Sequence, residues 1–284
     1  MNKPLAPTRC GNAEFRWGEK TYVMGVCNLS PDSFSGDGLG SDMEAIVAQA
    51  TRFVAEGADI IDIGGESTRP GTEPLPGDDI TKELELVIPA IARLAGALPV
   101  PVSIDTYKSA VADRAVKAGA AMINDIWGLK RDPVIAQVAA EARVPIILMG
   151  NQRDAPTRVG IMSKVISELE RSISVAVEAG ITEEKIIIDP GIGFGKSLEQ
   201  NLEIINRLAE LKSLGKPILL GTSRKSVIGL TLDLPADQRM EGTAATVAIG
   251  IANGADIVRV HDVKEMVRVC RMSDAIIRRG SIID

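Results

Sequence analysis

The sequence predicts an α/β fold, a (β/α)8 TIM barrel with a short N-terminal β-hairpin. Eight short apolar runs recur along the chain, each ends near a polar or ionisable residue, and helix-like stretches separate them. This alternation implies a parallel sheet. Runs without clear apolar-polar alternation fit strands that are covered on both faces. Since one such barrel needs about 250 residues, we expect a single domain over residues 1–284.

The strands are expected in a regular order after the hairpin. The hairpin is expected over residues 15–22, turning at Gly18, where it would plug the lower end of the barrel. The strands are expected at residues 22–27, 59–63, 101–104, 120–123, 144–149, 185–188, 217–220 and 255–260. A doubly wound open sheet is the alternative, but polar residues after nearly all eight units favour a closed ring.

Helices are expected between the strands, because apolar residues there recur at spacings of three and four. The clearest cases run from Met43 to Val54 and from Leu198 to Leu211. A capping box is expected at the start of each, formed by Ser41 with Glu44 in the first and by Ser197 with Gln200 in the second. Near the C-terminus, Met266, Val267 and Met272 fit either a core or an interface.

Composition and charge restrict the class of function. Hydrophobic residues make up 45% of the chain and charged residues 25%, as in an ordinary soluble protein with a large core. The formal net charge of -6 gives no general attraction to nucleic acid or to an anionic membrane. We therefore expect small-molecule substrates, and a local cluster of donors wherever an anion is bound.

Cysteine usage and the N-terminal segment predict a cytoplasmic location. Cys10, Cys27 and Cys270 are too few and too scattered for a disulfide framework or a CxxC metal site. Residues 1–11 lack an apolar stretch of the signal-peptide type, and no run approaches the roughly 20 apolar residues of a membrane span. Neither secretion nor membrane insertion is expected.

The polar residues at the strand ends are the candidate functional groups, because a parallel barrel gathers these ends on the rim that holds the active site. They are Asn28, Glu66, Asp105, Asn124, Asn151, Asp189, Lys225 and Arg259 with His261. Burying polar groups at an apolar mouth costs free energy unless a partner forms hydrogen bonds with them. This applies to the two carboxylates of Asp105 and Asp189 and to the amide of Asn124. A planar heterocycle with adjacent N–H donors is such a partner. For any one of them alone, a structural cap is the alternative.

The first two loops after strands also suggest anion binding. Residues 28–38 are polar and glycine-containing, which suits a lid over a phosphate or metal, although an ordinary surface loop has the same composition. In the next loop, Arg69 is able to hold an anion bidentately, yet a lone loop arginine more often points into solvent.

Three later loops add further candidates. Residues 189–197 miss the phosphate-loop spacing, because Pro190 stands where the first glycine belongs; their glycines would instead let Phe194 approach a flat ligand. Lys225, in a segment of two cations and three hydroxyls, is a candidate for stabilising an electron-rich ring or a carboxylate. Arg259 and the single histidine, His261, are expected on one side of an extended strand, facing one anion. No cluster of His, Cys and carboxylates has the spacing of a zinc site.

Seven strings occur in order between Tyr22 and Ile277: NLSPDSFS, GGESTRPG, SIDT, NDI, DPGIGFGKS, GTSRKS and RVHDV. The ordered set resembles the dihydropteroate synthases of the pterin-binding barrel family. The resemblance implies condensation of 6-hydroxymethyl-7,8-dihydropterin diphosphate with p-aminobenzoate, giving 7,8-dihydropteroate and pyrophosphate. It also implies Mg2+ as cofactor and a homodimer.

The resemblance also assigns residues to each ligand, all numbered here as in this chain. The pterin is implied to meet Asp105, Asn124, Met149, Asp189, Phe194, Gly221 and Lys225. The diphosphate is implied to meet Asn28, Thr68, Arg259 and His261, with Asn28 also holding Mg2+. p-Aminobenzoate is implied to meet Arg69, Pro70, Lys225 and Ser226. The implied catalytic set is Asp105, Lys225, Arg259 and His261.

One departure and two rival functions remain at this point. After Met149 the family commonly has histidine, whereas this chain has Gly150; the position is outside the implied pterin contacts, so we expect synthesis to survive. The first rival is a methyltetrahydrofolate-binding corrinoid methyltransferase, which has no diphosphate to hold. The second is a catalytically silent pterin-binding paralogue, which would bind ligand without releasing pyrophosphate.

Overall fold

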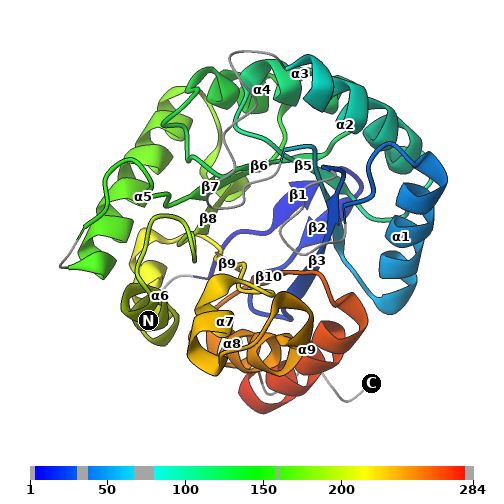
Figure 1. Ribbon diagram of the computed structural model, residues 1–284. Coiled ribbons are helices and arrows are strands. Elements are labelled where there is room, and N and C mark those ends of the chain that lie inside the picture. The colour runs from blue at the N-terminus through cyan, green and yellow to red at the C-terminus, as the bar shows by residue number, and fades with distance from the viewer. Residues whose placement is uncertain (1–3, 31–37, 67–79, 158–159, 279–284) are drawn as a thin grey trace.

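The computed structural model describes residues 4–30, 38–66, 80–157 and 160–278. Within them, eight strands form an inner sheet in the order β8-β7-β6-β5-β4-β3-β10-β9, and the pairs are parallel. A parallel bridge between Ile188 and Ile218 joins the two ends of this order. Helices surround the ring of strands (Figure 1). The expected barrel is confirmed.

All eight strands overlap the expected ranges, with small shifts of their ends. They are β3 (Tyr22–Asn28), β4 (Ile60–Gly64), β5 (Val102–Asp105), β6 (Met122–Asp125), β7 (Ile146–Met149), β8 (Ile186–Asp189), β9 (Leu219–Leu220) and β10 (Ile257–Val260). Most strands begin one or two residues later than expected. Several also run one or two residues further, so Asn28, Asp105, Asn124 and Asp189 belong to the strands themselves.

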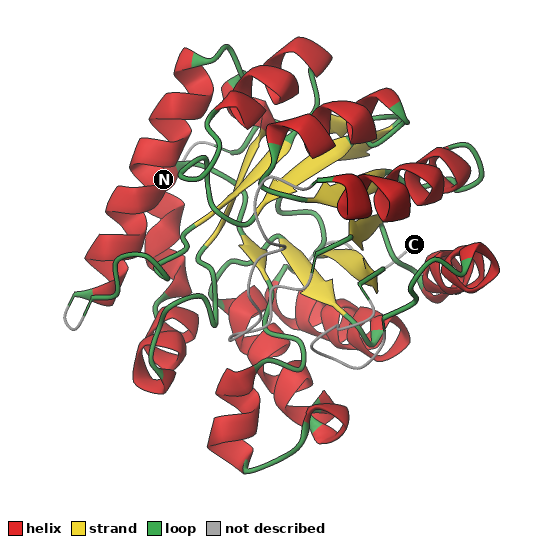
Figure 2. Ribbon diagram, turned by 45° about the horizontal axis from the view of Figure 1, so that its top comes forward, coloured by secondary structure: helices red, strands yellow, loops and turns green. Residues whose placement is uncertain are grey.

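The outer layer consists of α-helices that follow the strands in sequence (Figure 2). They are α1 (Met43–Glu56), α2 (Thr81–Ala95), α3 (Ser109–Lys117), α4 (Val134–Ala142), α5 (Ile161–Glu178), α6 (Leu198–Asn206), α7 (Ser226–Leu232), α8 (Met240–Ala252) and α9 (Val263–Ile277). Short 3-10 helices cover Glu183–Lys185, Leu208–Leu214 and Ala236–Gln238. The expected single helix from Leu198 to Leu211 is therefore an α-helix followed by a separate 3-10 segment.

The N-terminal hairpin exists but lies earlier than expected. Its strands, β1 (Thr8–Cys10) and β2 (Ala13–Phe15), are antiparallel. They turn at Gly11, whose φ of 57° is the left-handed conformation that glycine supplies at the first central position of a tight hairpin turn. The chain does turn around Gly18, whose φ is 91°, but the expected hairpin over residues 15–22 was wrong, because β3 pairs with β4 and β10 and not with β2.

The hairpin closes the lower end of the barrel, as expected. Cys10 and Phe15 join the apolar cluster of the inward-facing residues at the beginnings of the strands. The hydroxyl of Thr8 donates to the carbonyl oxygen of Glu184 at 2.5 Å, and the thiol of Cys10 donates to that of Ala121 at 3.2 Å. Bottom closure of this kind leaves the opposite rim for ligands.

One of the two expected helix caps is confirmed. Ser197 and Gln200 form a reciprocal capping box at the start of α6. At α1 the cap is Asp42 instead of Ser41, because the helix begins one residue later and the Asp42 carboxylate accepts from two backbone amides at 3.1 Å. Among the described residues, no helix combines the length and apolar character needed to cross a membrane.

Candidate active site

The carboxyl ends of the strands place the expected polar side chains around one mouth. Asp105 of β5 lies beside Asn124 of β6 in register, and Met149 of β7 lies beside Asp189 of β8. Arg259 reaches this group from β10, with Nη2 donating to Oδ2 of Asp105 at 2.7 Å. Five residues that are far apart in the sequence therefore meet because parallel strands end at the same rim.

A carboxylate that the sequence reasoning missed contacts this group. Asp62 of β4 is fully buried, and its Oδ2 accepts from Nε of Arg259 at 2.7 Å and from Nδ2 of Asn124 at 3.1 Å. The available signal was an acidic residue within an otherwise apolar run, two positions before the strand end at Gly64. The period of two along a strand puts Asp62 on the same face as Gly64, toward the barrel interior.

Burial and neighbouring charges both shift the pKa values of the ionisable side chains at the mouth. Burial raises the pKa of Asp105 to about 7, with Arg259 opposing the shift and Asp62 adding to it. Burial also raises the pKa of Asp189, against the opposing charge of Lys225 and a backbone N–H from Gly191. Burial lowers the pKa of Lys225 to about 8, with Asp189 opposing the shift.

Arg259 remains a cation in this setting. Burial alone lowers its pKa, but the carboxylates of Asp62 and Asp105 outweigh burial and raise the pKa above its ordinary value. Near pH 7 the mouth therefore holds one permanent cation and one acid, Asp105, that is poised between its charged and neutral forms.

An apolar wall stands beside the charged groups. It is a cluster of Ile126, Trp127, Met149 and Phe194, with Tyr107 packed against it. Nζ of Lys225 lies 4.9 Å from the centre of the Phe194 ring and donates to the carbonyl oxygen of Ile192 at 2.8 Å. A flat aromatic ligand fits such a wall, with its polar edge toward the carboxylates. Met149 and Phe194 were expected here, whereas Ile126 and Trp127 were not.

Lys196, also missed by the sequence reasoning, ties the loops after β7 and β8 together. Its ammonium donates to the carbonyl oxygens of Gly150 at 2.6 Å, Gly191 at 2.8 Å and Phe194 at 3.2 Å. Burial lowers the pKa of Lys196 to about 7. Gly150, where the resemblance led us to expect histidine, is thus one of the acceptors that hold the loop carrying Phe194.

Asn28, at the end of β3, lies in register with Gly64 of β4, which in turn lies in register with Asp105 of β5. A side-chain carbon at Gly64 would lie 3.8 Å from Oδ1 of Asn28 and 3.7 Å from Oδ2 of Asp105. The amide oxygen and the carboxylate therefore approach one another across the bare backbone of Gly64. The first two loops follow β3 and β4, whose last residues are Asn28 and Gly64.

His261 has surroundings different from those of Arg259. Its Nδ1 lies 3.0 Å from Oγ of Ser223, and the residue lines a cavity of about 250 Å³ together with Gln49, Arg224 and Asp262. The contacts of Arg259 described above are with carboxylates. The structure thus gives the two side chains separate partners, and a shared anion stays a prediction.

The remaining expected residues divide into three groups. Ser226 begins α7 directly after Lys225, and a side-chain carbon at Gly221 would lie 3.7 Å from Nζ of Lys225. Glu66 and Asn151, both strand-end candidates, have structural partners: Glu66 pairs with Lys108 at 2.7 Å, and Asn151 donates to the carbonyl oxygen of Ile126 at 2.9 Å. Thr68, Arg69 and Pro70 lie outside the described residues.

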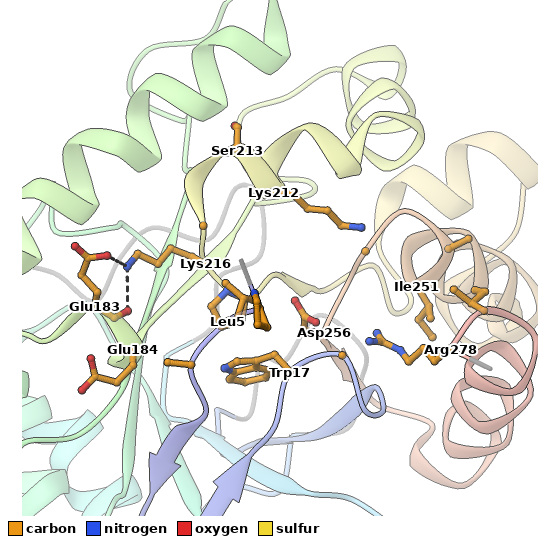
Figure 3. Close-up of a pocket in the computed structure, with 18 residues that line it drawn as sticks. Leu5, Trp17, Glu183, Glu184, Lys212, Ser213, Lys216, Ile251, Asp256 and Arg278 are labelled. Atoms are coloured by element: carbon orange, nitrogen blue, oxygen red, sulfur yellow. Dashed lines mark hydrogen bonds and ion pairs between the residues drawn. The ribbon is translucent and has the colours of Figure 1, made fainter. Parts of the chain in front are cut away.

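A second cavity, of about 790 Å³, opens at the opposite end of the barrel (Figure 3). Its lining includes Trp17 after the hairpin, Pro217 and Asp256 just before β9 and β10, and Arg278 at the end of α9. None of the expected site residues lines it. The chemistry of the strand ends and this cavity therefore belong to different ends of the molecule.

Comparison with known proteins agrees with this geometry. Residues 24–261 match the model of a family described as pterin binding enzyme. The dihydropteroate synthase of Clostridium beijerinckii is 50% identical over 272 residues, which cover 95% of this chain and 100% of that protein.

Solved structures show the same likeness. A dihydropteroate synthase from Clostridium difficile, in the presence of pteroic acid, is 48% identical with a TM-score of 0.87, covering 93% of this chain and 100% of that one. The enzyme of Xanthomonas albilineans with 4-aminobenzoic acid is 40% identical with a TM-score of 0.88, covering 96% and 98%. The arrangement of carboxylates, amide and cations at the mouth, together with these matches, places the chain in the pterin binding enzyme family.

Proposed function

We propose that the protein is a dihydropteroate synthase, which joins 6-hydroxymethyl-7,8-dihydropterin diphosphate to p-aminobenzoate and releases pyrophosphate. The observation that carries the proposal is the group formed by Asp105, Asn124, Asp189 and Lys225 beside the apolar wall. Relatives that cover the chain nearly end to end bear this name.

The mouth has the donors and acceptors that a pterin edge requires. Carboxylates accept from adjacent ring N–H groups, and a cation over an aromatic ring completes a slot for a flat, polar-edged heterocycle. In the proposed complex Asp105, Asn124 and Asp189 meet the edge of the pterin. Phe194 and Met149 cover its face.

The chemistry proposed is loss of diphosphate from the pterin methylene, leaving a cation that is delocalised into the ring. The carboxylates of Asp105 and Asp189 favour that cation by charge. Arg259 and His261 are proposed to face the leaving diphosphate. The aniline nitrogen of p-aminobenzoate then attacks the carbon and loses one proton, so the reaction needs no nucleophile from the protein.

The residues around Asn28 fit a magnesium ion that is held chiefly by the substrate. In the described part of the chain, no group of three or more His, Cys, Asp and Glu side chains is arranged to bind a metal. Mg2+ commonly keeps several waters and uses one or two protein oxygens plus substrate phosphates, and Asn28 offers one amide oxygen. When bound, Mg2+ would neutralise charge that develops on the diphosphate.

The p-aminobenzoate site is proposed beside the same cations. Lys225 and Ser226, at the junction of β9 and α7, are its described members. Arg69 and Pro70 complete the proposed set. A relative bound to 4-aminobenzoic acid supports the assignment.

A homodimer is proposed through the outer face of α7, α8 and α9. These three helices expose the large apolar side chains Leu230, Leu232, Met240, Ile249, Met272, Ile276 and Ile277, and exposed apolar surface that gathers into one patch commonly marks an interface. Met266 and Val267 are buried in the core. Light scattering of Ile249→Glu would give a monomer mass if this face is the interface, and an unchanged dimer mass if it is not.

The function is tested by supplying both substrates with Mg2+ and identifying the product by mass. Dihydropteroate is expected from the natural protein. Asp105→Asn should lose most turnover, whereas Asp113→Asn, a matched change at a partly exposed α3 residue paired with Lys117, should retain it. A methylated acceptor formed from methyltetrahydrofolate, with no dihydropteroate, would favour the methyltransferase instead.

A further inference from the structure

Asp62 contributes to the mouth without being able to touch a ligand there. Its side chain is fully buried within β4, and Oδ2 already accepts two hydrogen bonds. Both donors come from other strands, Asn124 from β6 and Arg259 from β10. A buried carboxylate with two donors from neighbouring strands acts on what those donors present to a substrate.

The first donor is the amide of Asn124. Because an ionised carboxylate only accepts, Nδ2 of Asn124 must face Asp62, and the opposite orientation would bring two acceptors together. Oδ1 is then directed away from Asp62. Asp62 thus turns Asn124 into an acceptor beside Asp105, matching a ligand edge that carries adjacent N–H groups.

The second donor is Arg259, whose guanidinium spans two carboxylates. Nε is bonded to Asp62 and Nη2 to Asp105, both at 2.7 Å. A ligand that takes the carboxylate of Asp105 must displace Nη2. The bond to Asp62 keeps Nε in place during that exchange, so the freed end of the guanidinium turns within the mouth while the side chain stays anchored.

We propose that Asp62 is a positioning residue: it fixes the amide of Asn124 for pterin recognition and anchors Arg259 while Asp105 changes partner. This inference rests on the proposed function for its kinetic readout, but its binding readout is independent of turnover. It deepens the site by explaining why a carboxylate that no ligand reaches is buried at the centre of the barrel.

The charge of Asp62 also affects the pKa of Asp105, which the pH profile of the reaction measures. The groups that act on Asp105 are Arg259 of β10 and Lys225 after β9, which lower its pKa, and Asp62 of β4 and Glu83 of α2, which raise it. Asp62→Asn keeps the shape and removes one of the raising charges. The pKa of Asp105 should then fall, and the acid limb of the pH profile for kcat/KM should move to lower pH.

The matched control is Ser103→Ala. Ser103 lies beside Asp62 in register on β5, is fully buried, and its hydroxyl has no hydrogen-bond partner among the described residues. The substitution removes a polar atom at the same depth without disturbing Asn124 or Arg259. Pterin affinity and the pH profile should both stay close to those of the natural protein.

The experiment compares the natural protein, Asp62→Asn and Ser103→Ala by kinetics and by calorimetric titration with pteroic acid. Asp62→Asn is expected to weaken pteroic acid binding and raise the KM for the pterin diphosphate about tenfold or more, the scale of one hydrogen bond to a charged group. The KM for p-aminobenzoate should change less than about twofold. Unchanged pteroic acid affinity together with an unmoved acid limb would overturn the proposal.

Two further results separate this inference from other failures. If the natural protein binds pteroic acid but forms no dihydropteroate, the proposed function fails and the titration still tests Asp62. If Asp62→Asn does not fold, a crystal structure of the natural protein with pteroic acid tests the proposed role of Asp62 instead. Asn124 and Nε of Arg259 should still contact Asp62 while Asp105 contacts the ligand, and loss of either contact with Asp62 would overturn the proposal.

Discussion

Removing Arg259 should destabilise the folded protein as well as weaken anion binding. The guanidinium makes two short ion pairs, with Asp62 and Asp105, and Asp62 is fully buried. Breaking a buried ion pair from one side leaves an uncompensated charge and typically costs about 3–5 kcal/mol. We expect Arg259→Ala to lower the free energy of unfolding by about this amount, a large part of the roughly 5–15 kcal/mol of a typical domain.

Urea unfolding at pH 7, followed by circular dichroism, measures the loss directly. The double variant Arg259→Ala with Asp62→Asn should recover at least half of it, because the stranded carboxylate is then neutral. Arg259 also lowers the pKa of Asp105, so in Arg259→Ala the acid limb of the pH profile should move to higher pH. A single variant as stable as the natural protein would show that the ion pairs do not hold the mouth together.

Three further predictions concern the same rim. The profile of kcat/KM against pH should be bell-shaped, rising as Asp105 ionises near pH 7 and falling as Lys225 loses its proton near pH 8; a flat profile between pH 6 and 9 would contradict both roles. Lys196→Met should lower the free energy of unfolding by about 2 kcal/mol or more, because three carbonyl oxygens lose their donor, and should raise the KM for the pterin substrate; a neutral effect in urea unfolding would count against the loop tie. Gly150→Ala should change the free energy of unfolding by less than about 1.5 kcal/mol, since the new carbon would lie 3.4 Å from its nearest neighbours. Gly191→Ala should lower it more, because φ is +72° and the new carbon would lie 2.3 Å from the carbonyl oxygen of Gly150. Equal shifts of the two melting temperatures would contradict this prediction.

The rim residues could be predicted from the sequence because topology does most of the placing. Once the chain is recognised as alternating strands and helices, residues such as Asp105 and Asp189 at strand ends must converge on one mouth. Neither side-chain contacts nor exact strand ends were needed for that inference. Strand shifts of one or two residues leave it intact.

The interior and the loops could not be predicted in the same way. Asp62 lies inside a strand, and only the inward register of the closed barrel reveals that it meets Arg259 from a strand nearly 200 positions later in the chain. Lys196 folds back onto three carbonyl oxygens, which depends on the path of two loops. His261 follows the end of β10, so the period of two that would align it with Arg259 no longer applies.

The most direct measurement follows pyrophosphate and dihydropteroate together, with 6-hydroxymethyl-7,8-dihydropterin diphosphate and Mg2+, in the presence and absence of p-aminobenzoate. A dihydropteroate synthase must form the two products in equal amounts when p-aminobenzoate is present, and Asp105→Asn must lose both. Tight binding of the pterin diphosphate with no pyrophosphate released would instead identify a catalytically silent pterin-binding protein.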